Sequence, residues 1–193
     1  MRTRKTLYAA AAAVGMAGPL LLGGGPASAD TGDRALFNTK TNLALTALQR
    51  NGAGEVIEGS KVGVKAFGAT DKAQKWIATS PSFGVVRYQL RNAVRGTNGA
   101  LVSGCLDLPR DVDRSQQLPG EILVIRRCDS SNSQRWTKFA VQSTPGVPKF
   151  RLNNVLSAMS IDVNGGQFSS AFQDVDDGGI AETTQSFTDP VVN

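Results

Sequence analysis

The sequence has 193 residues, with 21 lysines and arginines, 16 aspartates and glutamates and a net charge of +5 at pH 7. It contains no histidine, which excludes catalysis by a serine or cysteine that a histidine activates. Two cysteines without histidine cannot complete a tetrahedral metal site, so we expect neither a bound metal nor a cofactor.

The first 29 residues have the pattern of a secretory signal peptide. A basic start with Arg2, Arg4 and Lys5 precedes an apolar stretch, and Ala27-Ser28-Ala29 forms a small-residue cleavage site. Glycines and prolines interrupt the apolar stretch, which leaves it too short for a membrane anchor. The sequence therefore predicts a secreted, extracellular protein that is not inserted in a membrane after cleavage.

Removal of residues 1–29 would take away three positive charges and lower the net charge from +5 to about +2. The remaining basic residues are scattered along the chain, so we do not expect a nucleic-acid partner. Residues 30–193 have the length of a single domain with a full core.

Three similar segments follow the signal peptide, at about residues 34–86, 87–146 and 147–193. The first ends near Gln74-Lys75-Trp76, the second near Gln134-Arg135-Trp136, and the third near Gln185-Ser186-Phe187. Segments of this length are too long for helical solenoid repeats and fit about four short strands each.

Alternating polar and apolar residues predict strands at 62–67, 121–126 and 149–152. Turn signals such as Asn51-Gly52, Asn98-Gly99 and Pro119-Gly120 separate the strands, and no long helical period occurs. Closing three four-stranded units around a threefold axis would leave no open sheet edge. It would also bury one aromatic residue of each unit in a shared core.

Both cysteines lie in the second segment. An exported chain meets an oxidising compartment, so we predict a disulfide between Cys105 and Cys128.

The second segment resembles the ricin B-type lectin repeat. The similarity consists of Gly104-Cys105-Leu106-Asp107-Leu108, an apolar strand that ends in Cys128, and the closing Gln134-Arg135-Trp136. The resemblance implies a β-trefoil, an all-β fold of three four-stranded repeats with pseudo-threefold symmetry. In it, six strands form a barrel and three hairpins cap one end. The closing residues Gln74, Trp76, Gln134, Trp136, Gln185 and Phe187 are expected to be structural, with the large side chains in the core and the glutamines bonded to the backbone.

The resemblance also implies where sugar would bind. In this family an aspartate and a polar residue contact hydroxyl groups while an aromatic ring packs on the apolar face of the sugar. The second repeat keeps Asp107 and has Ser133 before its closing glutamine. It has Arg126 in place of the aromatic residue and Val124 in place of the polar residue, although Arg126 could bond an acidic sugar.

The third repeat keeps the aspartate as Asp162, and Phe172 and Gln173 follow as candidates to complete a pocket. In the first repeat no carboxylate matches Asp107, and Val64 and Ala66 fall at the polar and aromatic positions, so no sugar site is expected there. The acidic run at 176–179 lacks the alternating ligand spacing of a calcium loop and is interpreted as a solvated turn.

Two functions therefore remain open, and catalysis is disfavoured because no paired acid and base can be placed. The first is a secreted lectin-like module that binds carbohydrate weakly through the second or third repeat, or both. The alternative is a secreted trefoil with degenerate sugar sites that binds a secreted or cell-surface protein. It would act as a protease inhibitor or as a component of a secreted complex, with residues 110–118 as an interaction tip.

Overall fold

The structure is a computed structural model that describes residues 32–109, 117–141, 148–175 and 184–192. The predicted signal peptide and most of the 110–118 loop lie outside the described residues. Within these ranges no helical segment has the length and apolar character needed to cross a bilayer.

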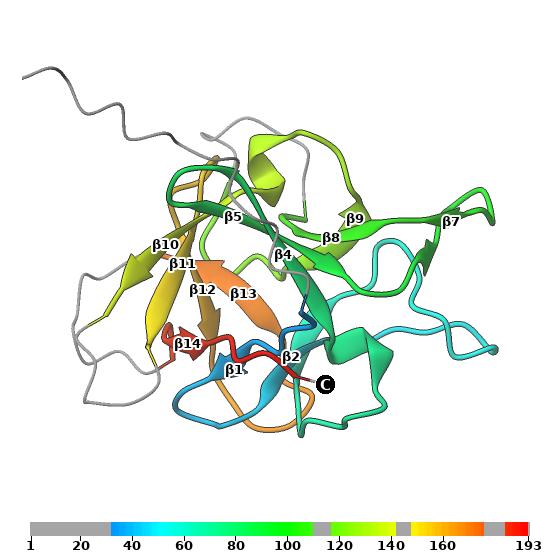
Figure 1. The fold of residues 1–193 in the computed structure, drawn as a ribbon, viewed down its shortest axis with the longest axis horizontal. Helices are drawn as coiled ribbons and strands as arrows, with labels where there is room; N and C mark the ends of the chain where they lie inside the picture. The colour runs from blue at the N-terminus through cyan, green and yellow to red at the C-terminus, as the bar shows by residue number, and fades with distance from the viewer. Residues whose placement is uncertain (1–31, 110–116, 142–147, 176–183, 193) are drawn as a thin grey trace, which may run out of the picture.

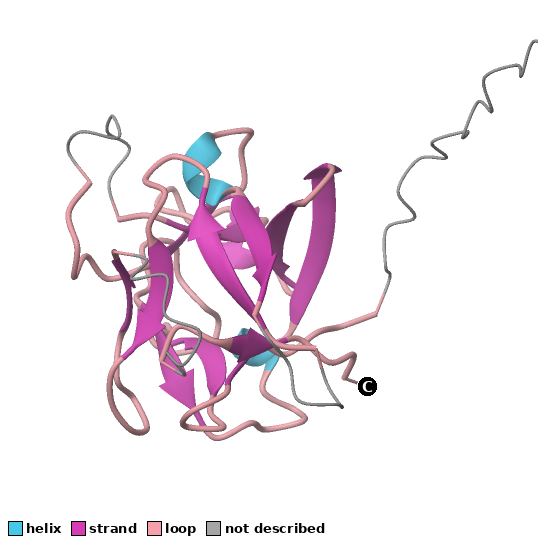
Figure 2. Ribbon diagram, turned by 90° about the vertical axis from the view of Figure 1, so that its left-hand side faces the viewer, coloured by secondary structure: helices cyan, strands magenta, loops and turns pink. Residues whose placement is uncertain are grey.

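The described chain consists of short strands joined by turns, with two short 3-10 helices (Figures 1 and 2). The first repeat contains β1 (Phe37–Asn38), β2 (Ala44–Ala47), β3 (Val62–Lys65), η1 (Lys72–Gln74) and β4 (Trp76–Ser82). The second contains β5 (Val85–Leu90), β6 (Val94–Arg95), β7 (Leu101–Val102), β8 (Gly104–Asp107), β9 (Val124–Arg127), η3 (Asn132–Gln134) and β10 (Trp136–Ala140). The third contains β11 (Phe150–Asn154), β12 (Ser160–Val163), β13 (Ala171–Asp174) and β14 (Phe187–Thr188).

Six of these strands form a closed ring of antiparallel pairs. The ring runs β1–β14–β11–β10–β5–β4, and a bridge between Arg34 and Trp76 brings β4 back to the start of the first repeat. Closure leaves no barrel strand with an unpaired edge. The hairpins β2–β3, β8–β9 and β12–β13 supply one cap element for each repeat.

This arrangement confirms the predicted β-trefoil. The strands expected at 62–67, 121–126 and 149–152 are present with different bounds, at Val62–Lys65, Val124–Arg127 and Phe150–Asn154. The second repeat adds the β6–β7 hairpin, whose turn contains Gly99 at a φ of 78°. That backbone conformation suits glycine because it has no Cβ atom.

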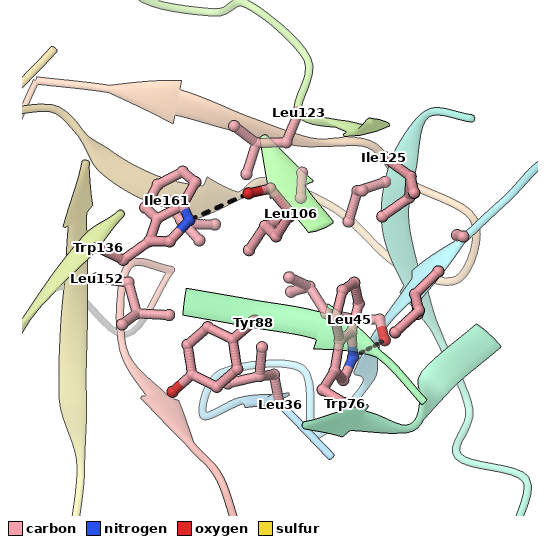
Figure 3. Packing of buried hydrophobic residues seen from close by; sticks show 14 of the residues in the cluster. Leu36, Leu45, Trp76, Tyr88, Leu106, Leu123, Ile125, Trp136, Leu152 and Ile161 are labelled. Carbon is pink, nitrogen blue, oxygen red and sulfur yellow. Dashed lines mark hydrogen bonds between the residues drawn. The ribbon is translucent and has the colours of Figure 1, made fainter. Parts of the chain in front are cut away.

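The core lies inside the barrel, where each repeat contributes its closing aromatic residue. Trp76, Trp136 and Phe187 are all fully buried and belong to one apolar cluster, in which Figure 3 labels the two tryptophans. The indole N–H of Trp76 donates to the carbonyl of Leu45 at 3.3 Å, and that of Trp136 donates to Leu106 at 3.3 Å. Each indole therefore joins the closing strand of its repeat to the first strand of its cap hairpin.

The predicted disulfide between Cys105 and Cys128 is present and is confirmed. It joins β8 to the residue that follows β9, because Cys105 lies in β8 and β9 ends at Arg127. Cys105 is fully buried.

A buried tyrosine ties the barrel to the C-terminal segment. The hydroxyl of Tyr88 donates to Oδ2 of Asp189 at 3.0 Å, and Lys138 Nζ lies 2.8 Å from the same oxygen. Burial raises the pKa of Tyr88 well above its ordinary value, and the negative charge of Asp189 adds to the effect. The phenol therefore stays neutral in the folded protein at pH values where an exposed tyrosine ionises.

We expect the free energy of unfolding to decrease as the pH rises above about 10, and to decrease less in Tyr88→Phe. The pKa of Tyr88 is higher in the folded than in the unfolded state, so its contribution is fully present below the unfolded pKa. That contribution is lost as the pH rises towards the folded pKa. Urea denaturation of both proteins at about pH 8 and about pH 11 measures the difference. An equal loss of stability in the two proteins would contradict this role of Tyr88.

Candidate functional site

The hydrogen bonds of the closing residues show which positions of the three repeats are equivalent. Trp76 bonds the carbonyl of Leu45, and Trp136 bonds the carbonyl of Leu106. Thr46 and Asp107, each one residue further on, therefore occupy equivalent positions in the first and second repeats. In the third repeat that place belongs to Asp162, because Gln185 Nε2 contacts Asp162 as Gln134 Nε2 contacts Asp107.

The strand registers then give the residues that face each of these positions. Thr46 pairs with Gly63, Asp107 with Val124 and Asp162 with Phe172. Two residues further along the second hairpin strand, and therefore on the same face, lie Lys65, Arg126 and Asp174.

Two assignments made from the sequence are corrected by this register. In the first repeat the facing positions are Gly63 and Lys65, one residue before the expected Val64 and Ala66. In the third repeat Asp174, and not Gln173, shares the face of Asp162 and Phe172. A shift of one residue turns a side chain to the opposite face of a strand.

Gln173, which the sequence suggested as a ligand residue, is fully buried on the opposite face. Its Nε2 donates to Gln117 Oε1 at 3.0 Å, to the carbonyl of Leu118 at 3.1 Å and to Glu121 Oε2 at 3.1 Å. Gln173 thus holds the described end of the 110–118 loop against β13. Within the described part of that loop, Gln117 is buried and Leu118 is exposed.

In the second repeat Asp107 is held firmly and is only 3% exposed. Its Oδ2 accepts from Gln134 Nε2 at 2.8 Å, and its Oδ1 accepts from the backbone N–H of Leu108 at 2.7 Å. Burial raises the pKa of Asp107, although these bonds and one from Ser133 oppose the increase. The carboxylate is already satisfied within the protein, which leaves it little capacity for a ligand.

The other second-repeat candidates are also engaged. The guanidinium of Arg126 donates to the carbonyl of Pro109, and Ser133 is buried with its hydroxyl 2.9 Å from that of Ser131. Val124, which faces Asp107, offers neither an aromatic ring nor a hydrogen bond from its side chain. The structure brings Asp107, Arg126 and Ser133 into one neighbourhood, with their polar groups directed to protein partners.

The third repeat presents a more open face. Asp162 and Phe172 are both half-buried, and they lie directly opposite each other on β12 and β13. The contact of Asp162 Oδ2 with Gln185 Nε2 is longer than its second-repeat counterpart, at 3.4 Å. Burial raises the pKa of Asp162, hydrogen bonds oppose the increase, and the nearby charge of Asp174 adds to it. A carboxylate beside an accessible ring can bond a hydroxyl group while the ring packs on apolar carbon.

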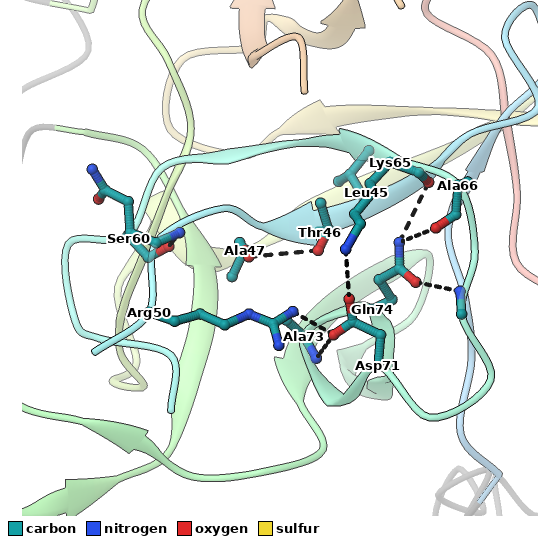
Figure 4. A network of polar contacts seen from close by, with 12 residues as sticks. Leu45, Thr46, Ala47, Arg50, Ser60, Lys65, Ala66, Asp71, Ala73 and Gln74 are labelled. Carbon is teal, nitrogen blue, oxygen red and sulfur yellow. Dashed lines mark hydrogen bonds and ion pairs between the residues drawn. The ribbon is translucent and has the colours of Figure 1, made fainter. Parts of the chain in front are cut away.

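The first repeat has a different set of polar groups (Figure 4). Asp71 is bonded by the Arg50 guanidinium and lies 3.6 Å from Lys65 Nζ. Burial acts to raise the pKa of Asp71, but the hydrogen bond and charge of Arg50 help to hold it below its ordinary value. At the facing position Gly63, a Cβ atom would lie 2.4 Å from the carbonyl oxygen of Ser169. No side chain fits where Phe172 stands in the third repeat.

The closing glutamines bond the backbone at the ends of the cap hairpins. Gln74 Nε2 donates to the carbonyls of Lys65 and Ala66, and its Oε1 accepts from the N–H of Gly68. Gln134 bonds the carbonyl of Arg127 and the N–H of Asp129 in the same way. Gln185 donates to the carbonyl of Val175 at 3.2 Å.

Within the described residues no group of three or more histidine, cysteine, aspartate or glutamate side chains could hold a metal ion. No protein-family model matches the sequence, and no curated protein matches it.

Solved structures do resemble the fold. The designed threefold-symmetric protein ThreeFoil matches with a TM-score of 0.62 and 16% identity over 81% of this chain and 96% of its own. A Polyporus squamosus lectin, solved with a human-type influenza-binding epitope, matches with a TM-score of 0.59 and 12% identity over 83% of this chain. This chain spans about half of that lectin, at 49% of its length.

SeviL, solved with the asialo-GM1 saccharide, matches with a TM-score of 0.54 and 13% identity over 84% of this chain and 98% of its own. At these identities the likeness concerns the fold alone. The protein is therefore a β-trefoil that shares its architecture with carbohydrate-binding lectins.

Proposed function

We propose that this protein is a secreted, lectin-like module that binds a neutral sugar through its third repeat and has no catalytic activity of its own. The observation that carries the proposal is the opposition of Asp162 and Phe172 on the β12–β13 hairpin. Both side chains are half-buried, so each has a surface that a ligand can reach. Two structural neighbours that were solved with bound saccharides, one of them a lectin, add support at the level of the fold.

The charges of this face favour a neutral sugar over an acidic one. Asp162 and Asp174 lie on the same face, and each would repel a carboxylate or sulfate group. A neutral pyranose can donate its hydroxyl protons to these carboxylates while its C–H face packs on Phe172. The binding is expected to be weak for a single site, because such a shallow face removes little apolar surface from water.

A matched pair of variants tests the location of the site. Phe172 in the third repeat and Val124 in the second occupy the same position, so Phe172→Ala and Val124→Ala make the same change on two faces. We expect Phe172→Ala and Asp162→Ala each to weaken binding of a neutral oligosaccharide by about tenfold or more. Val124→Ala should leave the affinity unchanged.

The oligosaccharide is first selected on an array of neutral glycans, and affinities are then measured by titration calorimetry. Loss of binding in Val124→Ala and Asp107→Ala, with Phe172→Ala unaffected, would move the site to the second repeat. A protein that binds none of these neutral glycans would contradict the proposed sugar site on the third repeat.

A further inference from the structure

A cleft lies away from the hairpin faces, where the first repeat meets the second. One hollow of about 480 Å³ is lined by the 50–56 turn, the start of η1 and the turn that follows β5. A second hollow of about 310 Å³ shares Lys72, Arg91 and Asn92 with the first, so the two are adjacent. We name this combined space the junction cleft. Its larger hollow falls within the size range of small-molecule sites in proteins.

The junction cleft has an excess of positive charge. Its lining contains four cations, Arg50, Lys72, Lys75 and Arg91, and two anions, Asp33 and Glu55. Both anions already have partners within the protein. Asp33 lies 3.2 Å from Arg91 and 3.9 Å from Lys75, and Glu55 accepts from Arg95 at 2.6 and 3.0 Å.

Lys72 is the cation that the fold leaves available. Its side chain is exposed, and it forms no ion pair with any residue in the described ranges, whereas Arg50 is paired with Asp71. Arg91 lies beside it in both hollows and is also exposed, with 49% of its side chain accessible beyond the contact with Asp33. A ligand anion would therefore meet one unpaired ammonium group and one accessible guanidinium group.

The remaining lining of the cleft is apolar or neutral. Leu101 forms a wall that is 56% exposed, while Val56 and Leu90 are buried beneath the cleft. Asn92 is half-buried and shared by both hollows, where its amide can bond hydroxyl groups. Apolar surface, an amide and two cations together match a molecule that has C–H faces, hydroxyl groups and one negative group.

From these features we infer that the junction cleft is a second binding site, specific for a saccharide unit that carries a carboxylate or sulfate group. The identification of the ligand as a saccharide rests on the proposed carbohydrate-binding function. Lys72 and Arg91 bind the anion, Asn92 bonds a hydroxyl group, and Leu101 packs on the ring. The two sites thus differ in charge preference, since the third-repeat face carries carboxylates and the cleft carries an excess of cations.

The test uses two ligands with the same sugar backbone and different charge. Trigalacturonate and its methyl ester have the same sugar units, but only the first carries carboxylates. We expect trigalacturonate to bind about tenfold or more tightly than the ester, and its affinity to decrease as salt is added. A carrageenan-derived tetrasaccharide, which carries sulfate groups and no carboxylate, tells a sulfate preference from a carboxylate preference in a parallel titration.

The variants locate this binding. Lys72→Gln combined with Arg91→Gln should weaken binding of the preferred acidic ligand by about tenfold or more. Lys40→Gln, which removes one positive charge at an exposed residue that lines neither hollow, should leave the affinity unchanged. Circular dichroism and thermal unfolding of each variant establish that it is folded.

The possible outcomes separate this inference from the proposed lectin function. Equal affinities of the protein for trigalacturonate and for its ester would overturn the cleft site. An unchanged affinity of the double variant for the acidic ligand would also overturn it, and so would inorganic sulfate that binds as tightly as the sulfated saccharide. Phe172→Ala should keep its affinity for the acidic ligand while it loses affinity for the neutral glycan. If the neutral glycan alone fails to bind, the third-repeat site is refuted and the cleft site stands.

Discussion

Replacement of Trp136 by alanine is expected to lower the free energy of unfolding by about 3–5 kcal/mol. The side chain is fully buried in the barrel, so its removal leaves a cavity and forfeits a large apolar contact area. The change also removes the N–H donor to the carbonyl of Leu106. Urea denaturation followed by circular dichroism measures the loss.

Two further variants make this result specific. Phe139 lies on the same strand, β10, and is 45% exposed, so Phe139→Ala should change the stability by no more than about 0.5 kcal/mol. Trp136→Phe should cost less than Trp136→Ala, because Phe187 fills the corresponding place in the third repeat. Equal effects of Trp136→Ala and Phe139→Ala would contradict the assignment of Trp136 to the core.

The repeated closing triplets explain why the fold could be predicted from the sequence. In each repeat a buried aromatic residue fills the barrel core, so Trp76 and Trp136 recur at the same position in their segments. The disulfide followed from the presence of only two cysteines in a chain that was expected to be exported. Both features depend on residue identity and coarse spacing, which a sequence displays directly.

To predict which side chains lie on each hairpin face, the strand register must be known to within one residue. The sequence does not define the register this closely. In β3 both Gly63 and Val64 are buried, so burial does not alternate along the strand and the pattern does not define the register. In β13 Gln173 is polar yet fully buried, because Gln117, Leu118 and Glu121 supply its partners from a distant loop.

The junction cleft could not be read from the sequence for a similar reason. Three of its four cations, Arg50, Lys72 and Arg91, are about twenty residues apart and lie among other scattered charges. Only the folded structure brings them together. It pairs Arg50 and Arg91 with carboxylates, whereas Lys72 has no ion-pair partner among the described residues. Net charge along the chain therefore understates the local charge of this surface.

Replacement of both Cys105 and Cys128 by alanine is expected to lower the free energy of unfolding by about 3 kcal/mol. The two residues are 23 positions apart, so the disulfide closes a sizeable loop and restricts the unfolded chain. Without this cross-link the unfolded chain is more expanded. We therefore expect the denaturant midpoint to fall and the dependence of the free energy on denaturant concentration to become steeper.

The third repeat provides the control for this variant. Ser160 stands where Cys105 stands in the second repeat, and its hydroxyl donates to Asn153 Oδ1 at 2.8 Å, so that hairpin forms without a disulfide. Ser160→Ala removes one hydrogen bond and should cost about 1 kcal/mol, with no change in the denaturant dependence. An unchanged denaturant dependence in the double cysteine variant would place the effect of the disulfide in the folded state. Because Asp162 and Phe172 lie on the β12–β13 hairpin, the folded double variant should retain the affinity of the third-repeat face for its sugar.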